Sequence, residues 1–405
     1  MNNIQKIQDA GLCISCGVCS ANCPKDCITF ELQNGMYQPQ AGGVCINCGR
    51  CLKVCPSEKL GEDIDASKLS AYVLGSYQQI LKAKIHDKDA LNKSTSGGVV
   101  TGLISELLAR GEFDAAFAVV GYDYHRQVKT VKIETAQELH QSCGSRYLPV
   151  SQTDAVKYIC ENKDKRVIIV ATSCATAAIE KSIALNHLQR DNYLLIGLFC
   201  DKTMHYGVVD HFDRISEMHG HRLTELHFRS KDGCKWPGKV KLVLDNQESI
   251  LLPSSARKKL KDYYVPERCL YCVDKLNRNA DISVGDNYIK KNADEEGISS
   301  VIIRTDAGME AWKDCSSLFE WSKDEEAELL DSQLIKKKEE NYAFGCLKGI
   351  YPQADVSKEL QKKYGELMRR RRLGRSEHSY SAVSWDIRKR QCIDKVKTKI
   401  RNFIR

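Results

Sequence analysis

Two runs of cysteine near the start constrain the fold of this 405-residue chain more than any other feature. Nine of the 19 cysteines precede residue 56, and eight of these form two copies of the pattern C-x2-C-x2-C-x3-C-P, 32 residues apart. The copies are Cys13, Cys16, Cys19 and Cys23 before Pro24, and Cys45, Cys48, Cys51 and Cys55 before Pro56. The chain begins without the apolar stretch of a secretory signal, so its dense cysteines indicate metal or redox chemistry and not disulfides.

The spacing of these cysteines predicts two [4Fe-4S] clusters. Three closely spaced thiolates surround one cluster, the proline turns the chain away, and the fourth cysteine ligates the other cluster. Zinc is the alternative, because C-x-x-C pairs also bind zinc, but two complete runs favour the clusters. Cys27 stands outside the pattern, and we interpret it as a buried thiol. We assign one cluster to Cys13, Cys16, Cys19 and Cys55, and the second to Cys45, Cys48, Cys51 and Cys23.

The rest of the chain has the pattern of an α/β core. Apolar runs of strand length at 115–122, 166–174 and 193–200 alternate with helix-like segments at 154–163 and 175–188. Later strand-like runs, at 239–245 and 300–305, lie among longer loops, which favours a mixed sheet. A capped helix is expected over 99–111, after Thr95-Ser96-Gly97-Gly98 and up to Gly111.

Charge is distributed unevenly along the chain. The formal net charge is +8, but residues 355–405 carry +10 and the remainder therefore −2. This near-neutral body does not indicate a nucleic-acid partner, and no apolar run approaches the roughly 18 residues of a membrane span. We expect a cytoplasmic protein. The basic tail contains four consecutive arginines, Arg369 to Arg372. It is expected either to contact an anionic membrane surface or an acidic partner, or to pack its apolar stripe on the body.

Other common cofactor and catalytic motifs are missing from the sequence. No two glycines are separated by one residue, which excludes the G-x-G of a standard dinucleotide fingerprint, and there is no Walker A motif. No nucleophile motif of the G-x-S-x-G type is present either. Five histidines cluster between residues 205 and 227 without the spacing of a metal-ligand motif, so we interpret them as polar loop residues.

From about Cys13 to about Gly308 the chain resembles the beta subunit of coenzyme F420 (deazaflavin) hydrogenases and dehydrogenases. The order and spacing of several short segments carry this resemblance. They are the two cysteine runs, residues 95–100, Gly144-Ser145-Arg146-Tyr147, residues 171–174, Gly197-Leu198-Phe199-Cys200, Phe228-Arg229 with Trp236, Cys269-Leu270-Tyr271-Cys272 and residues 280–286. The family often has Gly-Thr-Pro-Cys where residues 171–174 read Ala-Thr-Ser-Cys.

The resemblance implies bound FAD, a third [4Fe-4S] cluster in the flavin domain, and electron exchange between them. The segment before residue 99 would offer backbone N–H groups at a helix start to the FAD pyrophosphate, although a plain capped turn explains it equally well. Arg146 would pair with phosphate, Trp236 would cover a ring system, and Asp286 would lie near the flavin. The expected cofactor-binding residues are Ser96, Gly97, Gly98, Arg146, Trp236 and Asp286, and the expected ligands of the third cluster are Cys174, Cys200, Cys269 and Cys272.

The expected fold is α+β in four parts. A bacterial-ferredoxin-like domain at 1–60 is followed by a linker at 61–95, an α/β flavin domain with a mixed sheet at 96–350, and a basic helical tail at 351–405. The predicted function is that of an iron–sulfur flavoprotein oxidoreductase that exchanges electrons with a ferredoxin or a redox subunit and acts on an organic acceptor. A deazaflavin-oxidising or deazaflavin-reducing subunit and a non-catalytic electron-transfer subunit are the alternatives. No catalytic residue is assigned.

Overall fold

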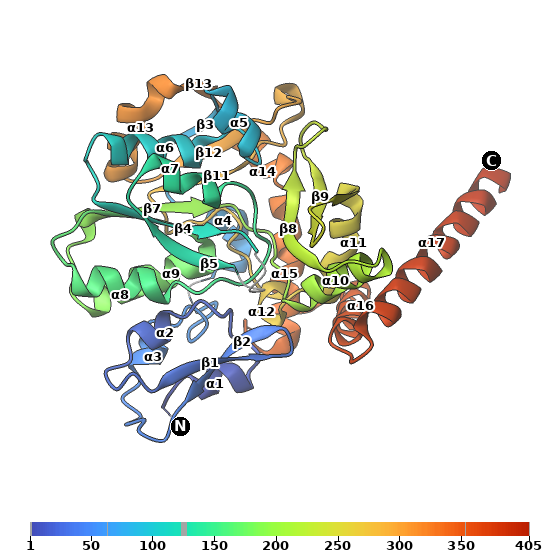
Figure 1. Ribbon diagram of the computed structural model, residues 1–405. Helices are drawn as coiled ribbons and strands as arrows, with labels where there is room; N and C mark the ends of the chain where they lie inside the picture. Colours follow the sequence, from blue (N-terminus) through green and yellow to red (C-terminus); the bar gives the residue numbers. More distant parts are fainter. Residues whose placement is uncertain (1, 63, 123–127, 353, 405) are drawn as a thin grey trace.

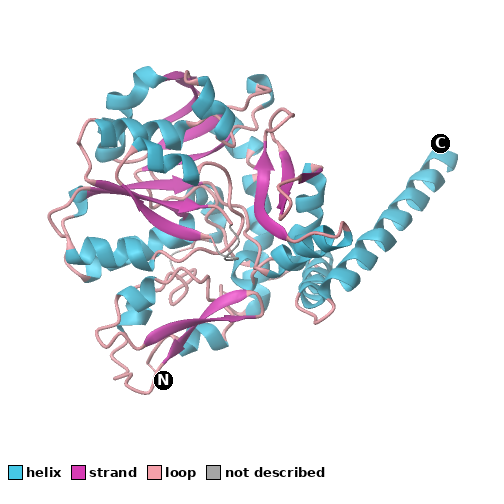
Figure 2. Cartoon of the chain, in the orientation of Figure 1, coloured by secondary structure: helices cyan, strands magenta, loops and turns pink. Residues whose placement is uncertain are grey.

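The structure is a computed structural model that describes residues 2–62, 64–122, 128–352 and 354–404, with side chains described up to residue 395. It contains a small N-terminal region, a large central sheet, a separate three-stranded sheet and a helical C-terminal part (Figure 1). Helices cover both faces of the central sheet (Figure 2).

The N-terminal region repeats one backbone conformation at both cysteine runs. Short helices α2 (Val18–Ala21) and α3 (Arg50–Lys53) each begin after a glycine in the left-handed region, Gly17 and Gly49, both with φ of 73°. The left-handed conformation costs glycine little, because it lacks a Cβ. Strands β1 (Ile28–Gln33) and β2 (Met36–Ala41) form an antiparallel hairpin between the runs, and α1 (Gln5–Asp9) precedes them.

The central sheet has eight strands in the order β13-β3-β12-β11-β7-β6-β4-β5. Strands β11, β7, β6 and β4 are parallel, and the pairings on either side of them are antiparallel, which gives the mixed sheet expected from the sequence. The strands are β3 (Gln79–Ile85), β4 (Ala115–Val120), β5 (Lys129–Ile133), β6 (Val167–Thr172), β7 (Tyr193–Leu198), β11 (Ile282–Asp286), β12 (Ser299–Ile303) and β13 (Phe319–Lys323).

Two apolar layers bury the two faces of this sheet. On one face α6 (Val99–Ala109) and α13 (Asp306–Cys315) pack against residues such as Val170 and Ile196. On the other face α8 (Thr153–Glu161) and α9 (Ser173–Leu185) pack against Ile169 and Leu195. The alternation of neighbouring residues between the layers follows from the period of two along a strand. The second layer also includes Val18 and Val54, so the N-terminal region packs directly on α8 and α9.

A second, smaller core surrounds the three-stranded sheet, whose order is β10-β9-β8. Its elements are β8 (Leu223–Ser230), β9 (Lys239–Leu244), β10 (Ser249–Leu252), α10 (Gly207–Met218) and α11 (Ser254–Tyr264). The remaining helices are α4 (Leu69–Leu74), α5 (Lys88–Lys93), α7 (Ala136–Leu139), α12 (Glu267–Leu270), α14 (Glu326–Ser332), α15 (Lys338–Lys348), α16 (Lys358–Gly374) and α17 (Ser379–Ile404).

The segment expected as a linker, 61–95, differs from that expectation. It contains α4, α5 and β3, and β3 pairs with both β12 and β13 inside the central sheet. Val73 and Leu81 are fully buried. The polar composition of the segment concealed this role, because β3 alternates buried apolar residues with partly exposed lysines.

The basic tail is only partly separate from the body. Helix α16 packs against α11, and the first turns of α17 are anchored by the buried Val383. The rest of α17 projects from the body (Figure 1). No helix of the described residues is long and apolar enough to cross a membrane.

Candidate functional site

The first predicted cluster site gathers four cysteines from distant parts of the N-terminal region. Burial raises the pKa of Cys13 to about 12, and the charge of Cys55 contributes to this rise. Burial also raises the pKa of Cys16, with further contributions from Cys55 and Cys13. The pKa of the fourth member, Cys19, is raised by burial and by the charges of the other three cysteines. Cys55 therefore lies near the three cysteines of the first run.

The second site lies beside the first and holds five cysteines where the sequence predicted four. One hollow is lined by Cys23, Cys27, Cys45, Cys48 and Cys51. The Sγ atoms of Cys23 and Cys27 are 3.4 Å apart. Cys27 is buried, as expected, but it faces this hollow instead of an unrelated part of the core.

The third site forms at one edge of the central sheet. Strands β6 and β7 are parallel neighbours with Thr172 opposite Leu198, so Cys174 and Cys200 follow strand ends at the same edge. The pKa of Cys200 is raised by burial and by the charges of Cys174, Cys269 and Cys272. The structure thus brings together the four cysteines that the resemblance implied.

The three sites form a continuous series in space. Cys19 of the first site is influenced by Cys51 of the second. On its other side, Cys16 is influenced by Cys174 of the third site. The first site therefore lies between the other two. This order is not visible in the sequence, where the third-site cysteines are more than a hundred residues from the first.

A single metal ion and an iron–sulfur cluster place different demands on the cysteines that bind them. Among the described residues, no group of three or more His, Cys, Asp or Glu side chains is arranged to hold one metal ion. A zinc ion needs thiolates at about 2.3 Å from a common centre. A cubane instead spreads its four thiolates over four iron corners, so wider sets of buried cysteines fit it. Iron bound at these thiols would deprotonate them and reverse the pKa increase that burial causes.

Buried cations accompany the third site. Arg268 is 6% exposed, precedes Cys269, and its Nε donates a long hydrogen bond of 3.4 Å to Ser57 Oγ, two residues after Cys55. Lys338, 2% exposed, lies beside Asp201 and is influenced by Cys272 and Cys200. These positive charges would offset the negative charge of thiolates at this site.

A cluster of polar side chains around an ion pair, which we call the polar cluster, lies near the third site. Asp286 ends β11, and its carboxylate accepts hydrogen bonds from Arg229 at 2.5 Å, Trp236 Nε1 at 3.0 Å and Tyr288 Oη at 3.0 Å. Burial alone would raise the pKa of Asp286, but the charge and hydrogen bonds of Arg229 hold it below its usual value. The carboxylate is therefore ionised and fully engaged.

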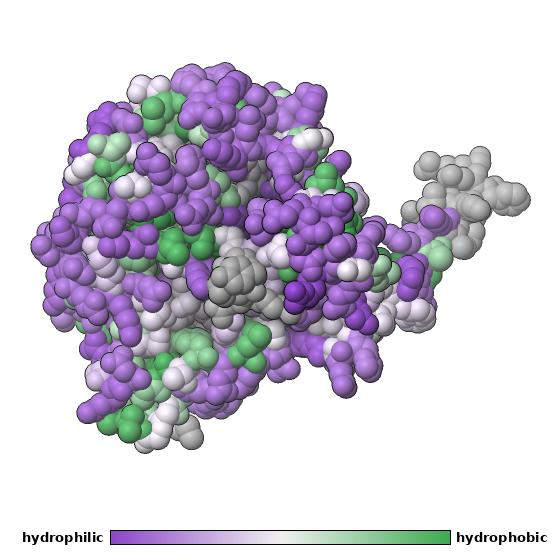
Figure 3. All heavy atoms as spheres, in the orientation of Figure 1, coloured by the Kyte–Doolittle hydropathy of each residue, from purple (hydrophilic) through white to green (hydrophobic). Residues whose placement is uncertain are grey.

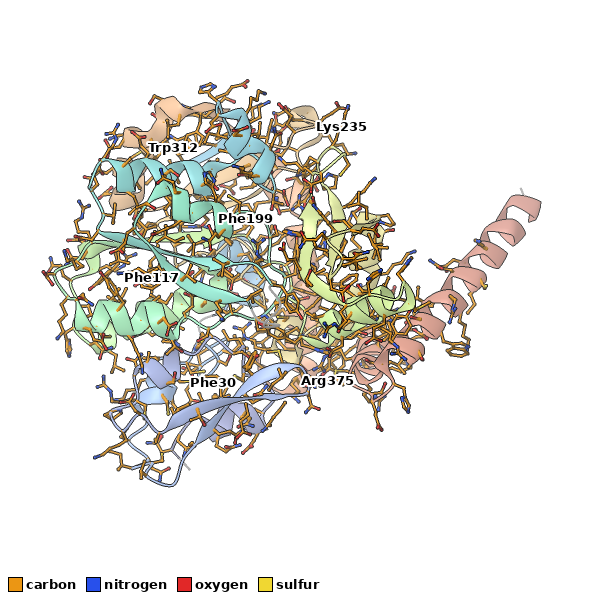
Figure 4. All side chains as sticks on the ribbon, viewed as in Figure 1. Phe30, Phe117, Phe199, Lys235, Trp312 and Arg375 are labelled. Carbon is orange, nitrogen blue, oxygen red and sulfur yellow. The ribbon has the colours of Figure 1, made fainter. Side chains whose placement is uncertain are left out.

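Phe199, the residue before Cys200, connects the polar cluster to the third site. A Cβ on Gly285 would lie 2.2 Å from the Phe199 ring, so the ring packs directly on the glycine that precedes Asp286. The Phe199 backbone N–H also donates to Val284 O at 2.8 Å. Phe199, labelled in Figure 4, packs against the apolar cluster that contains Val273, Leu276 and Ile302.

The turn before α6 lies beside the polar cluster. The hydrogen bonds of its Ser96 and Gly97 differ from those expected from the sequence. Ser96 Oγ donates to Ile298 O at 2.7 Å, and the Gly97 N–H donates to Ser299 Oγ at 3.1 Å. A Cβ on Gly97 would lie 2.3 Å from Ala83 O, so close packing requires this glycine. Gly98, with φ of 75°, is the N-cap of α6. Ser96 and Gly97 are thus committed to the turn itself, which leaves the N–H groups of the first turn of α6 as potential donors.

Arg146 reaches the same region from the loop after α7. Its Nη2 donates to Cys143 O at 2.7 Å, while its buried Nε has no hydrogen-bond partner within the described part of the chain. Burial lowers the pKa of Arg146. Its loop contacts the α6 turn through Ser145 Oγ and Thr95 Oγ1, 3.2 Å apart. A buried guanidinium with an unused donor is suited to a phosphate group.

The histidines between 205 and 227 do not all lie in polar loops as predicted. His205 is 2% exposed and His211, on α10, is 6% exposed. His211 Nδ1 lies 2.9 Å from Tyr264 Oη, and burial lowers its pKa to about 4. His219, His221 and His227 lie near the surface. The helical spacing of apolar residues around His211 was the sequence signal that could have indicated its burial.

Comparison with known proteins identifies the family. Residues 80–157 match the N-terminal part, and residues 164–324 the C-terminal part, of the family described as coenzyme F420 hydrogenase/dehydrogenase, beta subunit. The chain belongs to this family. The match begins inside β3, within the segment that was expected to be a linker.

Family relatives include two curated proteins and one solved structure. The chain is 27% identical to the coenzyme F420-dependent sulfite reductase of Methanocaldococcus jannaschii over 82% of its own length, but it spans only half of that relative. It is 26% identical to the coenzyme F420 hydrogenase subunit beta of Methanosarcina barkeri, covering 68% of this chain and 96% of the subunit. A chain of the F420-reducing [NiFe] hydrogenase complex from Methanosarcina barkeri superposes with a TM-score of 0.51 at 25% identity, covering 68% of this chain and 92% of that chain. Membership supports an oxidoreductase role.

Proposed function

We propose that this protein is an iron–sulfur flavoprotein oxidoreductase that forms part of a larger electron-transfer system. When bound, clusters of this type carry single electrons, and FAD couples them to a two-electron, hydride-type step on an organic acceptor. The observation that carries the proposal is the series of three cysteine sites, with the polar cluster around Asp286 near the third.

The chain's own residues would hold each group as follows. The eight cysteines of the two runs would ligate two [4Fe-4S] clusters, and Cys174, Cys200, Cys269 and Cys272 a third. Arg146 and the first turn of α6 would bind the FAD pyrophosphate, which needs a cation and free N–H donors. Trp236, fixed by its hydrogen bond to Asp286, would flank the ring system.

The hydrogen bonds within the polar cluster indicate the role of Asp286. Its carboxylate accepts four hydrogen bonds from three side chains and has a lowered pKa, so it is not available as a general base near neutral pH. We infer that it orients Arg229 and Trp236 instead. Phe199 packs on Gly285, the residue before Asp286, and directly precedes Cys200, so it links the polar cluster to the third cysteine site.

Deazaflavin is the candidate acceptor that the relatives favour, because several of them are named for coenzyme F420. A non-catalytic electron-transfer subunit is the remaining alternative. Since it lacks an organic substrate, it would retain the clusters and show no turnover with any acceptor.

Anaerobic purification tests the proposal. We expect twelve irons per chain, four for each of three clusters, and one released flavin that is identified as FAD. Reduced ferredoxin should bleach the flavin, and NADH alone should not, because the chain lacks a dinucleotide fingerprint. Oxidised deazaflavin is then added as electron acceptor for the ferredoxin-reduced protein. Zinc without iron, or protein without flavin, would refute the proposal, whereas bleaching by ferredoxin without deazaflavin turnover would exclude only that acceptor.

A further inference from the structure

The basic tail, which the sequence offered as a docking element, uses much of its charge internally. Arg369 donates to Asp386 at 3.0 Å, and Arg370 to Asp262 at 2.6 Å. Arg371, whose side chain is 3% exposed, donates to the backbone of Val265 at 3.0 Å. The arginine run therefore fastens α16 to the body. These three arginines are therefore not available to a partner protein.

The surface around Cys48 differs from the rest of the cysteine sites. Cys48 is exposed, whereas the other eleven predicted ligands are buried or half-buried. Two large apolar residues flank Cys45 nearby: Val44 is 67% exposed and Ile46 is 58% exposed. Apolar side chains are visible at this end of the molecule, where the N-terminal region lies (Figures 1 and 3). Because electron transfer slows steeply with distance, the exposed site is the natural point of exchange with another protein.

Two hollows meet at this position. The first is lined by the five cysteines of the second site together with Ile46 and Lys25, and the second is an open hollow of about 390 Å³. Both include Asn2, Cys48 and Gly49 in their walls, so they form one continuous surface. We call it the Cys48 surface.

The charges on the Cys48 surface are mostly positive. Lys25, Lys53, Lys59 and Lys181 line the two hollows, against a single carboxylate, Glu58. That carboxylate is paired with Lys6 at 2.9 Å. Lys53 and Lys59 are exposed, and Lys59 also forms an exposed ion pair with Glu62 at 3.2 Å. An apolar centre with a positive rim is complementary to an acidic protein surface.

We propose that the Cys48 surface is the docking site for an acidic protein that carries a one-electron centre near its own surface. The inference rests on the proposed function, since it requires a cluster behind Cys48. Val44 and Ile46 would form the desolvated centre of the contact, and the lysines would steer the partner by long-range attraction.

The test compares charge reversals on two faces of the full-length holoprotein. Lys53→Glu/Lys59→Glu changes the Cys48 surface, and Lys389→Glu/Lys395→Glu makes the same change on the exposed part of α17. The probe is an acidic bacterial-type ferredoxin in its reduced form. Stopped-flow absorbance measures the second-order rate constant for reduction of the holoprotein at several salt concentrations.

We expect Lys53→Glu/Lys59→Glu to lower the rate constant about tenfold at low salt and to flatten its salt dependence, because steering is screened over roughly 8 Å at physiological salt. The α17 variant should behave like wild type. Val44→Ser/Ile46→Ser should lower the rate at every salt concentration. The reverse ranking of the two charge variants would overturn the proposal, as would an equal loss with dithionite, a small anion that needs no docking.

Iron content and the electron paramagnetic resonance signals of the reduced clusters are measured first on every variant. Wild-type protein without a cluster at the second site would contradict the proposed function itself. A full complement of clusters with an unchanged ferredoxin rate in Lys53→Glu/Lys59→Glu would contradict only the docking site.

Discussion

Removal of the Asp286 carboxylate tests whether the ion pair stabilises the polar cluster near the third cysteine site. In Asp286→Ala the Arg229 guanidinium, whose side chain is 4% exposed, loses its counter-charge and keeps only the carbonyls of Pro237 and Thr95, at 2.9 and 3.5 Å. Breaking a buried pair by removing one partner costs about 3–5 kcal/mol. The remaining carbonyl contacts place the expected loss at the lower end, about 3 kcal/mol.

The cost should be shared between the two partners. Removing both charges in Arg229→Met/Asp286→Ala leaves no orphaned ion, so we expect the double variant to lose about 2 kcal/mol less than the sum of the single variants. Asp232→Ala is the matched control on the same small sheet. Its pair with Lys241 at 2.6 Å is exposed on the Asp232 side, and its loss should cost less than about 1 kcal/mol.

Anaerobic urea unfolding, monitored by tryptophan fluorescence at neutral pH, measures these differences, and flavin content is determined in parallel. A lowered pKa means that the Asp286 contribution is complete above about pH 4 and is lost only as the pH falls further. The gap between wild type and variant should therefore stay constant from pH 8 to pH 5. A loss below 1 kcal/mol in Asp286→Ala, or strictly additive variants, would refute the reasoning.

Three further predictions concern other parts of the chain. Cys269→Ser should reduce the iron content from about twelve to about eight and keep the signals of the two N-terminal clusters, whereas loss of all iron would contradict independent sites. His211→Gln should flatten the pH dependence of stability between pH 6.5 and 4, where the unfolded state binds a proton that buried His211 refuses, by about 1.4 kcal/mol per pH unit; an unchanged slope in urea unfolding at pH 7 and 5 would disprove this. Truncation after Arg390 should leave the melting temperature unchanged, but truncation after Ala354 should lower it, because it removes the buried Val383 and the Asp386 contact with Tyr263 at 2.6 Å; equal melting temperatures would show that α16 is dispensable.

Spacing alone predicted the cysteine ligand sets of the N-terminal region. A repeat of 32 residues with glycine at equivalent positions yields the same left-handed turn twice, because that conformation is a local property of the chain. The strands at 115–122, 166–174 and 193–200 and the helix from residue 99 were also predictable, because their apolar periods are local. Family resemblance, and not periodicity, supplied the third cysteine set.

Only the tertiary structure decided which distant groups meet. Strand β3 reads as polar linker because its lysines point outward, and its place between β12 and β13 depends on pairing partners more than two hundred residues away. The roles of Ser96 and Gly97 changed for the same reason, since Ser299 and Ala83 occupy the space beside them. Arginines at 369–371 carry one sequence pattern whether they face solvent or carboxylates, and the packing of α16 on the body selects the carboxylates. Charge and composition are read along the chain, but burial and pairing depend on its path in space.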